Sequence, residues 1–507
     1  MLAVASWTSV TRYESRYAFR ADLPPGEPLA DRVVLVVLDG IRLDVSRRMP
    51  QLQSLAARGS SGSMQVALPS LSNPNRAVLV TGAWPEVNGV TNNALHRPPP
   101  IDSVFSLAKA AGIPVAAAGS TIWGRAFGVH LEGHLLFQRK GPDIGAEAPE
   151  LIRWQEARCA EEIAFLRDYH SGFLAVGVTS ADAAGHDYGG ESETYHEVAL
   201  AVDRCLGSVV ASLDDGRTAF VIGSDHGHIQ RRGAGGHGGA EPEVVEVPLV
   251  LAGLGIRQNG GWSARIVDVA PTICALLGLP LPATNQGDPL WPALDLSPAH
   301  EAQLRERAAE QQALTVSRIP DRADLQELGK RERLKPAMVA FLMTGALIVV
   351  VFVRRRVRWF TVAVAATVYF ATYYLLFFAT GLGYSLSDVG REEYLLRFLG
   401  ANISEAGGAF LVSSLVAMGA TRNWIHRWDS PLATDLALLI SGLLGLRVAW
   451  IYWNSGLIMT AAMLDLDLSF EACLHLLEII GIALVVALLL VIRCLRKNPS
   501  RPAQPDH

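Results

Sequence analysis

The chain has 507 residues, of which 50% are hydrophobic and 18% charged, with a formal net charge of −5 and a mean hydropathy of +0.24. This length indicates about two or three domains. The apolar content excludes a disordered chain, and the acidic balance excludes a strongly basic nucleic-acid-binding protein. An association with membranes is therefore the leading expectation.

The charged and apolar residues are unevenly distributed. Only 13 of the 44 basic and 11 of the 49 acidic residues follow Pro336, so the preceding part has the balance of an ordinary soluble domain and the rest is mainly apolar. We therefore divide the chain into an N-terminal extension, a globular domain, a charged helical linker, a transmembrane domain and a tail, over residues 1–31, 32–297, 298–335, 336–497 and 498–507.

Residues 1–31 show no basic start, apolar stretch and cleavage site of a signal peptide. A folded domain of this size does not easily cross a membrane without a leading signal. We therefore expect either that Met1 lies downstream of the true start or that the domain is cytoplasmic, and we favour the first.

Within residues 32–297, short apolar runs alternate with longer amphipathic segments. The runs that predict strands are 33–38, 113–118, 173–178, 219–222 and 248–252, and the segments that predict helices include 49–57 and 193–213. This alternation predicts an α/β fold with a largely parallel sheet flanked by helices.

Three of the predicted strands lead into an acidic residue. These residues are Asp39, Asp182 and Asp225. Because reactive groups of open α/β sheets gather at the carboxyl ends of the strands, we expect the three carboxylates to share one edge.

Histidines accompany these aspartates at spacings that suit a metal site. His186 follows Asp182 by four residues, His226 follows Asp225 directly, and His237 lies among four glycines. Each pair alone is weak evidence, since a turn or a surface pair explains it equally well. Together they predict a binuclear site for two divalent ions, with Zn²⁺ favoured and Mn²⁺ or Mg²⁺ as alternatives.

The candidate nucleophile is Ser72, in the segment Ser72-Asn-Pro-Asn-Arg76. A hydroxyl at a helix N-terminus and beside a metal ion has a lowered pKa and can attack as an alkoxide. Two alternatives stay open: Ser72 is only the N-cap of the following helix, or the neighbouring Ser70 is the nucleophile.

These motifs occur in the order seen in the alkaline phosphatase superfamily. The chain most resembles its type I phosphodiesterase and nucleotide pyrophosphatase branch, nearest the lipid-linked, GPI-type phosphoethanolamine transferases. The residues that carry the resemblance are 33–44, 69–75, 80–90, 182–186 and 223–227, with His237-Gly-Gly as a sixth element.

The resemblance implies a phosphodiesterase or phosphotransferase, a hydrolase-type enzyme acting on phosphate esters. It implies that Ser72 forms a covalent phospho-serine intermediate, resolved by water or an alcohol, and that Asn93 binds a phosphoryl oxygen. It also implies two metal-ligand sets: Asp39, Ser72, Asp225 and His226 for one ion, and Asp182, His186 and His237 for the other.

Other readings of the motifs stay open. Ser72-Asn-Pro-Asn-Arg76 also fits a serine-type sulfatase signature, although the paired aspartates usual in sulfatases are missing at Asp39-Gly40. A non-catalytic membrane scaffold of the same fold is a further alternative. Arg76 and His228 are candidates for the substrate pocket, as are His96, His130 and His134.

Five apolar stretches after Pro336 are long enough to cross a bilayer, at 337–353, 359–380, 401–420, 432–454 and 473–493. The loops on one side hold more Lys and Arg, which favours a catalytic domain on the extracytoplasmic side of an integral, multi-pass membrane protein. Ionisable groups in these stretches suggest that the tail binds a lipid substrate as well as anchoring the chain. They are Glu405, Asp435, Arg447, His475 and Glu478.

The expected partners are therefore a membrane and a phosphate-ester substrate such as a lipid head group, with no nucleic acid. The five cysteines contain no CxxC pair, which argues against a thiolate zinc site. One disulfide among Cys159, Cys205 and Cys274 stays open.

Overall fold

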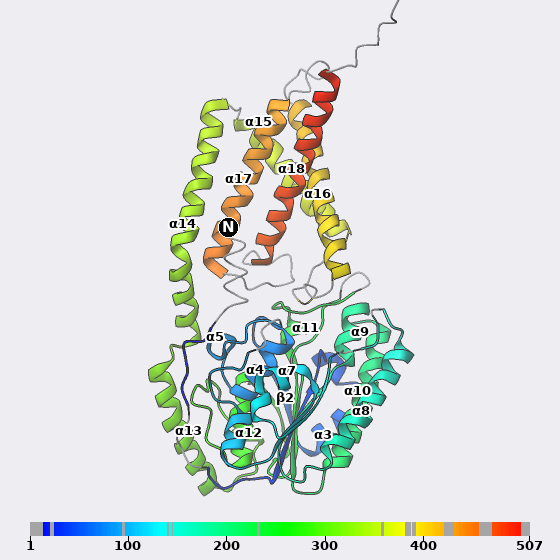
Figure 1. Ribbon diagram of the computed structural model, residues 1–507, viewed down its shortest axis with the longest axis vertical. Helices are drawn as coiled ribbons and strands as arrows, with labels where there is room; N and C mark the ends of the chain where they lie inside the picture. The colour runs from blue at the N-terminus through cyan, green and yellow to red at the C-terminus, as the bar shows by residue number, and fades with distance from the viewer. Residues whose placement is uncertain are drawn as a thin grey trace, which may run out of the picture. The chain divides into compact units, whose positions relative to one another are not determined.

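The computed structural model describes residues 14–20, 25–93, 97–138, 141–143, 145–230, 234–355, 359–380, 387, 392–419, 430–455 and 469–497 (Figure 1). The chain forms two compact units. The first comprises chiefly the described residues up to Gln326, and the second comprises the helices from Glu327 onward.

An eight-stranded sheet forms the centre of the first unit, in the order β4-β3-β5-β1-β6-β7-β2-β8. Strand β7 is antiparallel to both of its neighbours, and all other neighbouring strands are parallel. The predicted α/β fold with a largely parallel sheet is therefore confirmed. The strands are β1 (Arg32–Leu38), β2 (Ser60–Gln65), β3 (Val115–Ser120), β4 (Gly133–Phe137), β5 (Gly172–Val178), β6 (Thr218–Gly223), β7 (Glu246–Gly253) and β8 (Asn259–Arg265).

Helices cover both faces of this sheet. Alternate residues of β1 enter different cores: Val33, Leu35 and Val37 one, and Val34, Val36 and Leu38 the other. The first core also contains α4 (Ser72–Thr81), α6 (Val104–Ala110), α7 (Thr121–Phe127) and α12 (Val269–Leu277). The second contains α3 (Pro50–Arg58), α8 (Ala148–Leu166), α9 (Ser180–Tyr188) and α10 (Glu193–Leu213), as Figure 1 shows.

All five predicted strands are present, and three further strands are not predicted by the sequence pattern. Strands β2 and β8 are rich in serine and glycine, and β4 is a short strand at one edge. None of them is the continuous apolar run that marks a strand buried on both faces.

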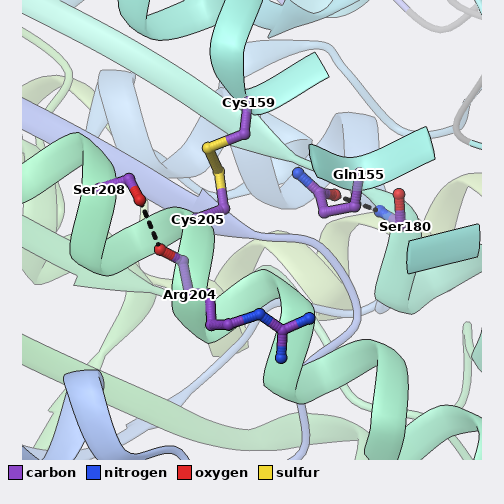
Figure 2. Close-up of a disulfide and its surroundings, with 6 residues drawn as sticks. All are labelled: Gln155, Cys159, Ser180, Arg204, Cys205 and Ser208. Carbon is purple, nitrogen blue, oxygen red and sulfur yellow. Dashed lines mark hydrogen bonds between the residues drawn. A yellow bond between two sulfur atoms is a disulfide. The ribbon is translucent and has the colours of Figure 1, made fainter. Parts of the chain in front are cut away.

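One disulfide joins α8 to α10, between Cys159 and Cys205, which are 46 residues apart in the chain (Figure 2). This settles the pairing that the cysteine count left open. Cys274 is a buried free thiol, and the side chains of Cys473 and Cys494 lie outside the described part.

The first unit also contains α2 (Leu43–Ser46), α5 (Pro85–Asn88), α11 (Pro242–Val245) and α13 (Pro298–Arg318). Helix α14 (Arg322–Arg355) follows and runs without a break through Pro336, where we placed the end of the linker. The remaining helices are α15 (Trp359–Thr380), α16 (Glu392–Gly419), α17 (Ser430–Ser455) and α18 (Ser469–Lys497).

Four stretches of described helix are long and apolar enough to cross a membrane: Glu327–Arg354, Phe398–Ala417, Ala433–Asn454 and His475–Ile492. The prediction was five. Helix α15 occupies the remaining predicted span, but its apolar stretch in the described part, Val362–Phe377, is shorter than the other four.

Candidate active site

The three predicted aspartates lie together at one edge of the sheet. Asp39 directly follows β1, Asp225 follows β6, and Asp182 lies in the first turn of α9, just after β5. Strands β5, β1 and β6 are parallel neighbours, so their carboxyl ends meet there. The expectation that these carboxylates share one edge is confirmed.

Four histidines converge on a single oxygen of Asp182. The distances from Asp182 Oδ1 to the Nε2 atoms are 3.1 Å for His228, 3.3 Å for His237, 3.5 Å for His186 and 3.8 Å for His226. All five side chains are buried. The donor atoms of Asp182, His226, His228 and His237, which we name the histidine group, lie within 4.8 Å of one another.

A second set of donors shares His226 with the first. Asp39, Asp225 and His226, which we name the aspartate group, also have their donor atoms within 4.8 Å of one another. His226 Nε2 is 3.4 Å from Asp39 Oδ1 and 3.8 Å from Asp225 Oδ1. Buried imidazoles and carboxylates in this density are a donor set that fits a divalent ion such as Zn²⁺.

Ser72 lies beside the histidine that the two groups share. Its Oγ is 3.1 Å from His226 Nε2. Helix α4 begins at Ser72 and its N-cap is Leu71, so Ser72 is not merely an N-cap. The hydroxyl therefore stands at the positive end of the helix dipole, next to the candidate metal ligands.

Ser70, the alternative nucleophile, has a different role in the structure. Its Oγ donates a hydrogen bond to Gly239 O at 2.6 Å and accepts one from Gly238 N at 3.0 Å. Its carbonyl oxygen lies 2.8 Å from His237 Nδ1. Ser70 therefore connects the segment before Ser72 to the loop that carries His237.

Arg76 is buried behind the aspartate group. It is four residues after Ser72 on α4, and its guanidinium contacts Asp39 Oδ2 at 2.6 Å and Asp225 Oδ2 at 2.9 Å. Burial alone would lower its pKa, but the charges of Asp39 and Asp225 outweigh that effect and raise it. Arg76 is thus a permanent cation, 1% exposed, placed against the two carboxylates of the aspartate group.

His228, the other candidate for the substrate pocket, is fully buried among the candidate ligands. Its ring lies against Gly40 and Gly185, where a Cβ atom would approach it to 2.9 and 2.5 Å respectively. Burial lowers the pKa of His228 to about 3, against the opposing effect of the Asp182 carboxylate. The ring is therefore a neutral imidazole.

Asn93 reaches the nucleophile segment through Asn73. Asn93 Oδ1 accepts a hydrogen bond from Asn73 N at 2.9 Å, and Asn73 Nδ2 donates one to Asn93 O at 2.9 Å. Asn93 itself is exposed, so its amide is accessible beside residue 72. The predicted pocket residue His96 lies outside the described residues, and neither metal group includes His130 or His134.

Tyr195 supports the loop that carries Asp39, and sequence reasoning missed it. Its hydroxyl donates to Gly40 O at 2.5 Å and accepts from Arg42 N at 3.1 Å. Burial raises the pKa of Tyr195, so the hydroxyl stays protonated. The available signal was the apolar face of helix α10, which places Tyr195 toward the core.

A cavity of about 220 Å³ lies beside the segment that leads to Ser72. Leu68, Trp84 and Ala240 line it, with Arg265 from the end of β8. Strands β2 and β8 are parallel to β6 in this sheet, so the cavity is at the same edge as the metal groups.

Helices α15, α16 and α18 are joined by polar contacts between their side chains, most of which are buried. Glu478 accepts a hydrogen bond from Tyr369 OH at 2.7 Å, and its other oxygen is 2.7 Å from His475 Nδ1. Tyr373 OH donates to Asn402 Oδ1 at 2.8 Å, and Thr380 Oγ1 donates to Glu405 at 2.9 Å. These contacts connect α15, α16 and α18.

Residues 33–234 match the family model "Type I phosphodiesterase / nucleotide pyrophosphatase". The chain is similar to GPI ethanolamine phosphate transferase 1 of Mus musculus, with 26% identity over 315 residues, which cover 52% of this chain and 33% of the relative. It is also similar to the catalytic subunit of human GPI ethanolamine phosphate transferase 2, with 28% identity over 306 residues, covering 56% and 30%.

Among solved structures, the chain is similar to murine ectonucleotide pyrophosphatase / phosphodiesterase 5, with 15% identity, a TM-score of 0.42, and coverage of 49% of this chain and 95% of that one. The chain spans about a third of the length of the curated relatives it matches. Residues 33–234 carry the type I phosphodiesterase / nucleotide pyrophosphatase family match, and the chain has homologues among the GPI ethanolamine phosphate transferases.

Proposed function

We propose that this chain is a membrane-integral, metal-dependent phosphodiesterase or phosphotransferase that acts through a phospho-serine at Ser72. The observation that carries the proposal is the position of Ser72 Oγ, 3.1 Å from His226 Nε2, where the histidine and aspartate groups meet. A nucleophilic role for Ser72 accounts for the two buried groups of candidate metal ligands beside its hydroxyl, and a purely structural role does not.

The residues of the chain fit an in-line displacement at phosphorus. Ser72 Oγ loses its proton to solvent and attacks phosphorus, and the bond to the leaving oxygen breaks with its electron pair on that oxygen, which takes up a proton and departs as the alcohol. Water or an acceptor alcohol then loses its proton and attacks the phospho-serine, and the bond from phosphorus to Ser72 Oγ breaks, so that Oγ takes up a proton and the serine is restored. Divalent ions held by the two groups would lower the pKa of the serine hydroxyl and offset the charge of the phosphoryl group.

Two further groups would position the substrate. Asn93, exposed beside the nucleophile segment, is our candidate donor to a phosphoryl oxygen. The cavity next to Leu68 and Trp84 is our candidate site for the part of the substrate that does not react. Because the curated relatives are named as ethanolamine phosphate transferases, we propose a lipid head-group phosphate ester as the substrate class.

We further propose that the catalytic domain lies on the extracytoplasmic side of the membrane. Disulfides persist in oxidising compartments, and the Cys159–Cys205 bond lies within this domain. The excess of Lys and Arg in the loops expected on the opposite side supports the same orientation. Thiol labelling in intact cells with a membrane-impermeant maleimide, at a cysteine introduced at the exposed Ser54, tests this, and the proposed side predicts labelling without permeabilisation.

The activity test uses the full chain in detergent with added Zn²⁺ or Mn²⁺ and an aryl phosphodiester as the probe. We expect hydrolysis that Ser72→Ala lowers by about 10³-fold or more. Ser208→Ala is the matched control, since it removes an exposed serine hydroxyl on α10 that donates to Arg204 O. Full activity in Ser72→Ala, or faster turnover of an aryl sulfate than of the phosphodiester, would contradict the proposal.

A further inference from the structure

The two candidate metal groups differ in the charge that already surrounds them. The histidine group consists of three imidazoles and one carboxylate, with a fourth imidazole, His186, 3.5 Å from the same carboxylate oxygen. The aspartate group consists of two carboxylates and the shared His226. A buried arginine, Arg76, is in direct contact with both carboxylates of the aspartate group.

Arg76 divides the oxygens of the two carboxylates. Its Nη2 atom lies 2.6 Å from Oδ2 of Asp39, and its Nε atom lies 2.9 Å from Oδ2 of Asp225. The Oδ1 atoms of both carboxylates face His226 Nε2. In each carboxylate, Oδ1 thus lies on the side of His226, among the candidate metal ligands, while Oδ2 is neutralised by a cation.

We infer that the two metal groups bind ions unequally, the histidine group tightly and the aspartate group weakly, and that Arg76 is the residue that sets this difference. This inference rests on the proposed metal dependence. A permanent positive charge one carboxylate away from an incoming divalent ion repels it, and burial removes most of the solvent screening that would weaken the repulsion. The imidazoles of the histidine group, in contrast, are the donors that Zn²⁺ prefers, and the charge of Arg76 acts on Asp182 less strongly than on Asp39 and Asp225.

The charge of Arg76 also offsets the repulsion between the two carboxylates of the aspartate group. Two buried carboxylates close together are costly unless a cation is near, and Arg76 supplies that cation in the folded chain. A negatively charged phosphate ester entering the site adds the charge that favours a second divalent ion. The second ion is therefore expected to bind with the substrate more than before it.

The test is a Zn²⁺ titration of the full, metal-depleted chain in detergent, followed by calorimetry and by elemental analysis after dialysis. We expect one tight equivalent and a second at least about tenfold weaker. His237→Ala should remove the tight equivalent, and Asp225→Asn should remove only the weak one.

Three arginine variants then isolate the effect of charge. Arg76→Met should tighten the second equivalent by at least about tenfold, because the two carboxylates lose their resident cation. Arg76→Lys keeps the charge and should keep the second site weak. Arg32→Met is the matched control: Arg32 is 2% exposed and binds Thr218, Tyr169 O and Asp215, away from both metal groups, so its loss should not change the second equivalent.

The outcomes separate this inference from the proposed function. Two equally tight equivalents in the unaltered chain would overturn the inference and leave the metal-dependent function standing. No Zn²⁺ bound at all would overturn both. If Arg76→Met does not fold, the ratio of the two affinities in the unaltered chain and their assignment through His237→Ala and Asp225→Asn still decide the question.

Discussion

Nε2 of His228 lies 3.1 Å from Oδ1 of Asp182, and the imidazole reaches this place because residues 40 and 185 have no Cβ atom. A Cβ at position 185 would stand 2.5 Å from Cδ2 of His228, and one at position 40 would stand 2.9 Å from Nε2. The two glycines belong to the motifs Asp39-Gly40 and Asp182-Ala-Ala-Gly185-His186. The two glycines leave a space, which we name the glycine slot, for the imidazole of His228 beside Asp182.

Because the His228 ring fills the space beside Gly185, we expect a large effect from adding one methyl group at that position. Gly185→Ala should displace the His228 ring, lower the melting temperature by the equivalent of about 1–3 kcal/mol and weaken Zn²⁺ retention. In a helix, Gly to Ala ordinarily stabilises, so a loss is diagnostic. Gly128→Ala is the control, because a Cβ there meets no heavy atom within 4 Å. Unchanged stability and Zn²⁺ affinity in Gly185→Ala would exclude the glycine slot.

Glu162 predicts a pH-dependent stability. It is 1% exposed in α8, and burial raises its pKa to about 8, against the effect of Arg158. The unfolded chain releases this proton near its ordinary pKa of about 4.3. The folded chain therefore binds more protons between these values, so stability that is present below about pH 4.3 is lost progressively up to about pH 8.

Replacing this carboxyl should remove that loss. The difference in melting temperature between Glu162→Gln and the unaltered chain should increase in favour of the variant from pH 5 to pH 8 and then stay constant. Glu156→Gln is the matched control, since the Glu156 side chain is exposed on the same helix and pairs with Arg204 at the surface. If the melting temperatures of Glu162→Gln and of the unaltered chain change equally with pH across this range, the raised pKa of Glu162 is refuted.

The disulfide predicts a redox-dependent stability. It closes a loop of 46 residues between α8 and α10, for which chain-entropy arguments give about 4 kcal/mol. A reductant should therefore lower the melting temperature of the unaltered chain. The double variant Cys159→Ser/Cys205→Ser should melt at the reduced value and show no response to reductant. A response in that variant would mean that the stabilisation has another source.

The hydrogen bond between Tyr369 in α15 and Glu478 in α18 is expected to contribute modestly to the stability of the helix bundle. Tyr369→Phe removes the hydrogen bond to Glu478 and should destabilise the helix bundle by about 0.6–2 kcal/mol. Tyr452→Phe, whose hydroxyl makes no hydrogen bond with the described residues, should cost less. Thermal melts of both variants in detergent check this, and equal losses would argue against a role for the Tyr369–Glu478 contact.

The site edge was predictable because its signals are local. The strand that ends before Asp39 is a continuous β-branched run, and Asp182 and Asp225 follow similar runs. A parallel sheet then brings the three carboxylates to one edge by geometry alone. Strands β2 and β8 were missed because their serines and glycines resemble loop sequence, and they find their places only by pairing with β7 and each other.

The roles of Arg76 and His228 were not predictable from the sequence. The four-residue spacing puts Arg76 on the same helix face as Ser72, but whether that face meets substrate or carboxylates depends on how α4 packs on the sheet. His228 needs the absence of two side chains on separate segments, at Gly40 after β1 and at Gly185 in α9. The Cys159–Cys205 pairing likewise depends on the packing of α8 against α10 (Figure 2).

The most direct test of the account is the chemical state of residue 72 during turnover. The full chain is mixed with Zn²⁺ and an aryl phosphodiester, quenched in acid within the first turnover, digested and analysed by mass spectrometry. We expect the phosphoryl group of the substrate on Ser72 and on no other residue, and none in Ser72→Ala. Turnover with Ser72 unmodified, or formylglycine at position 72, would contradict the account.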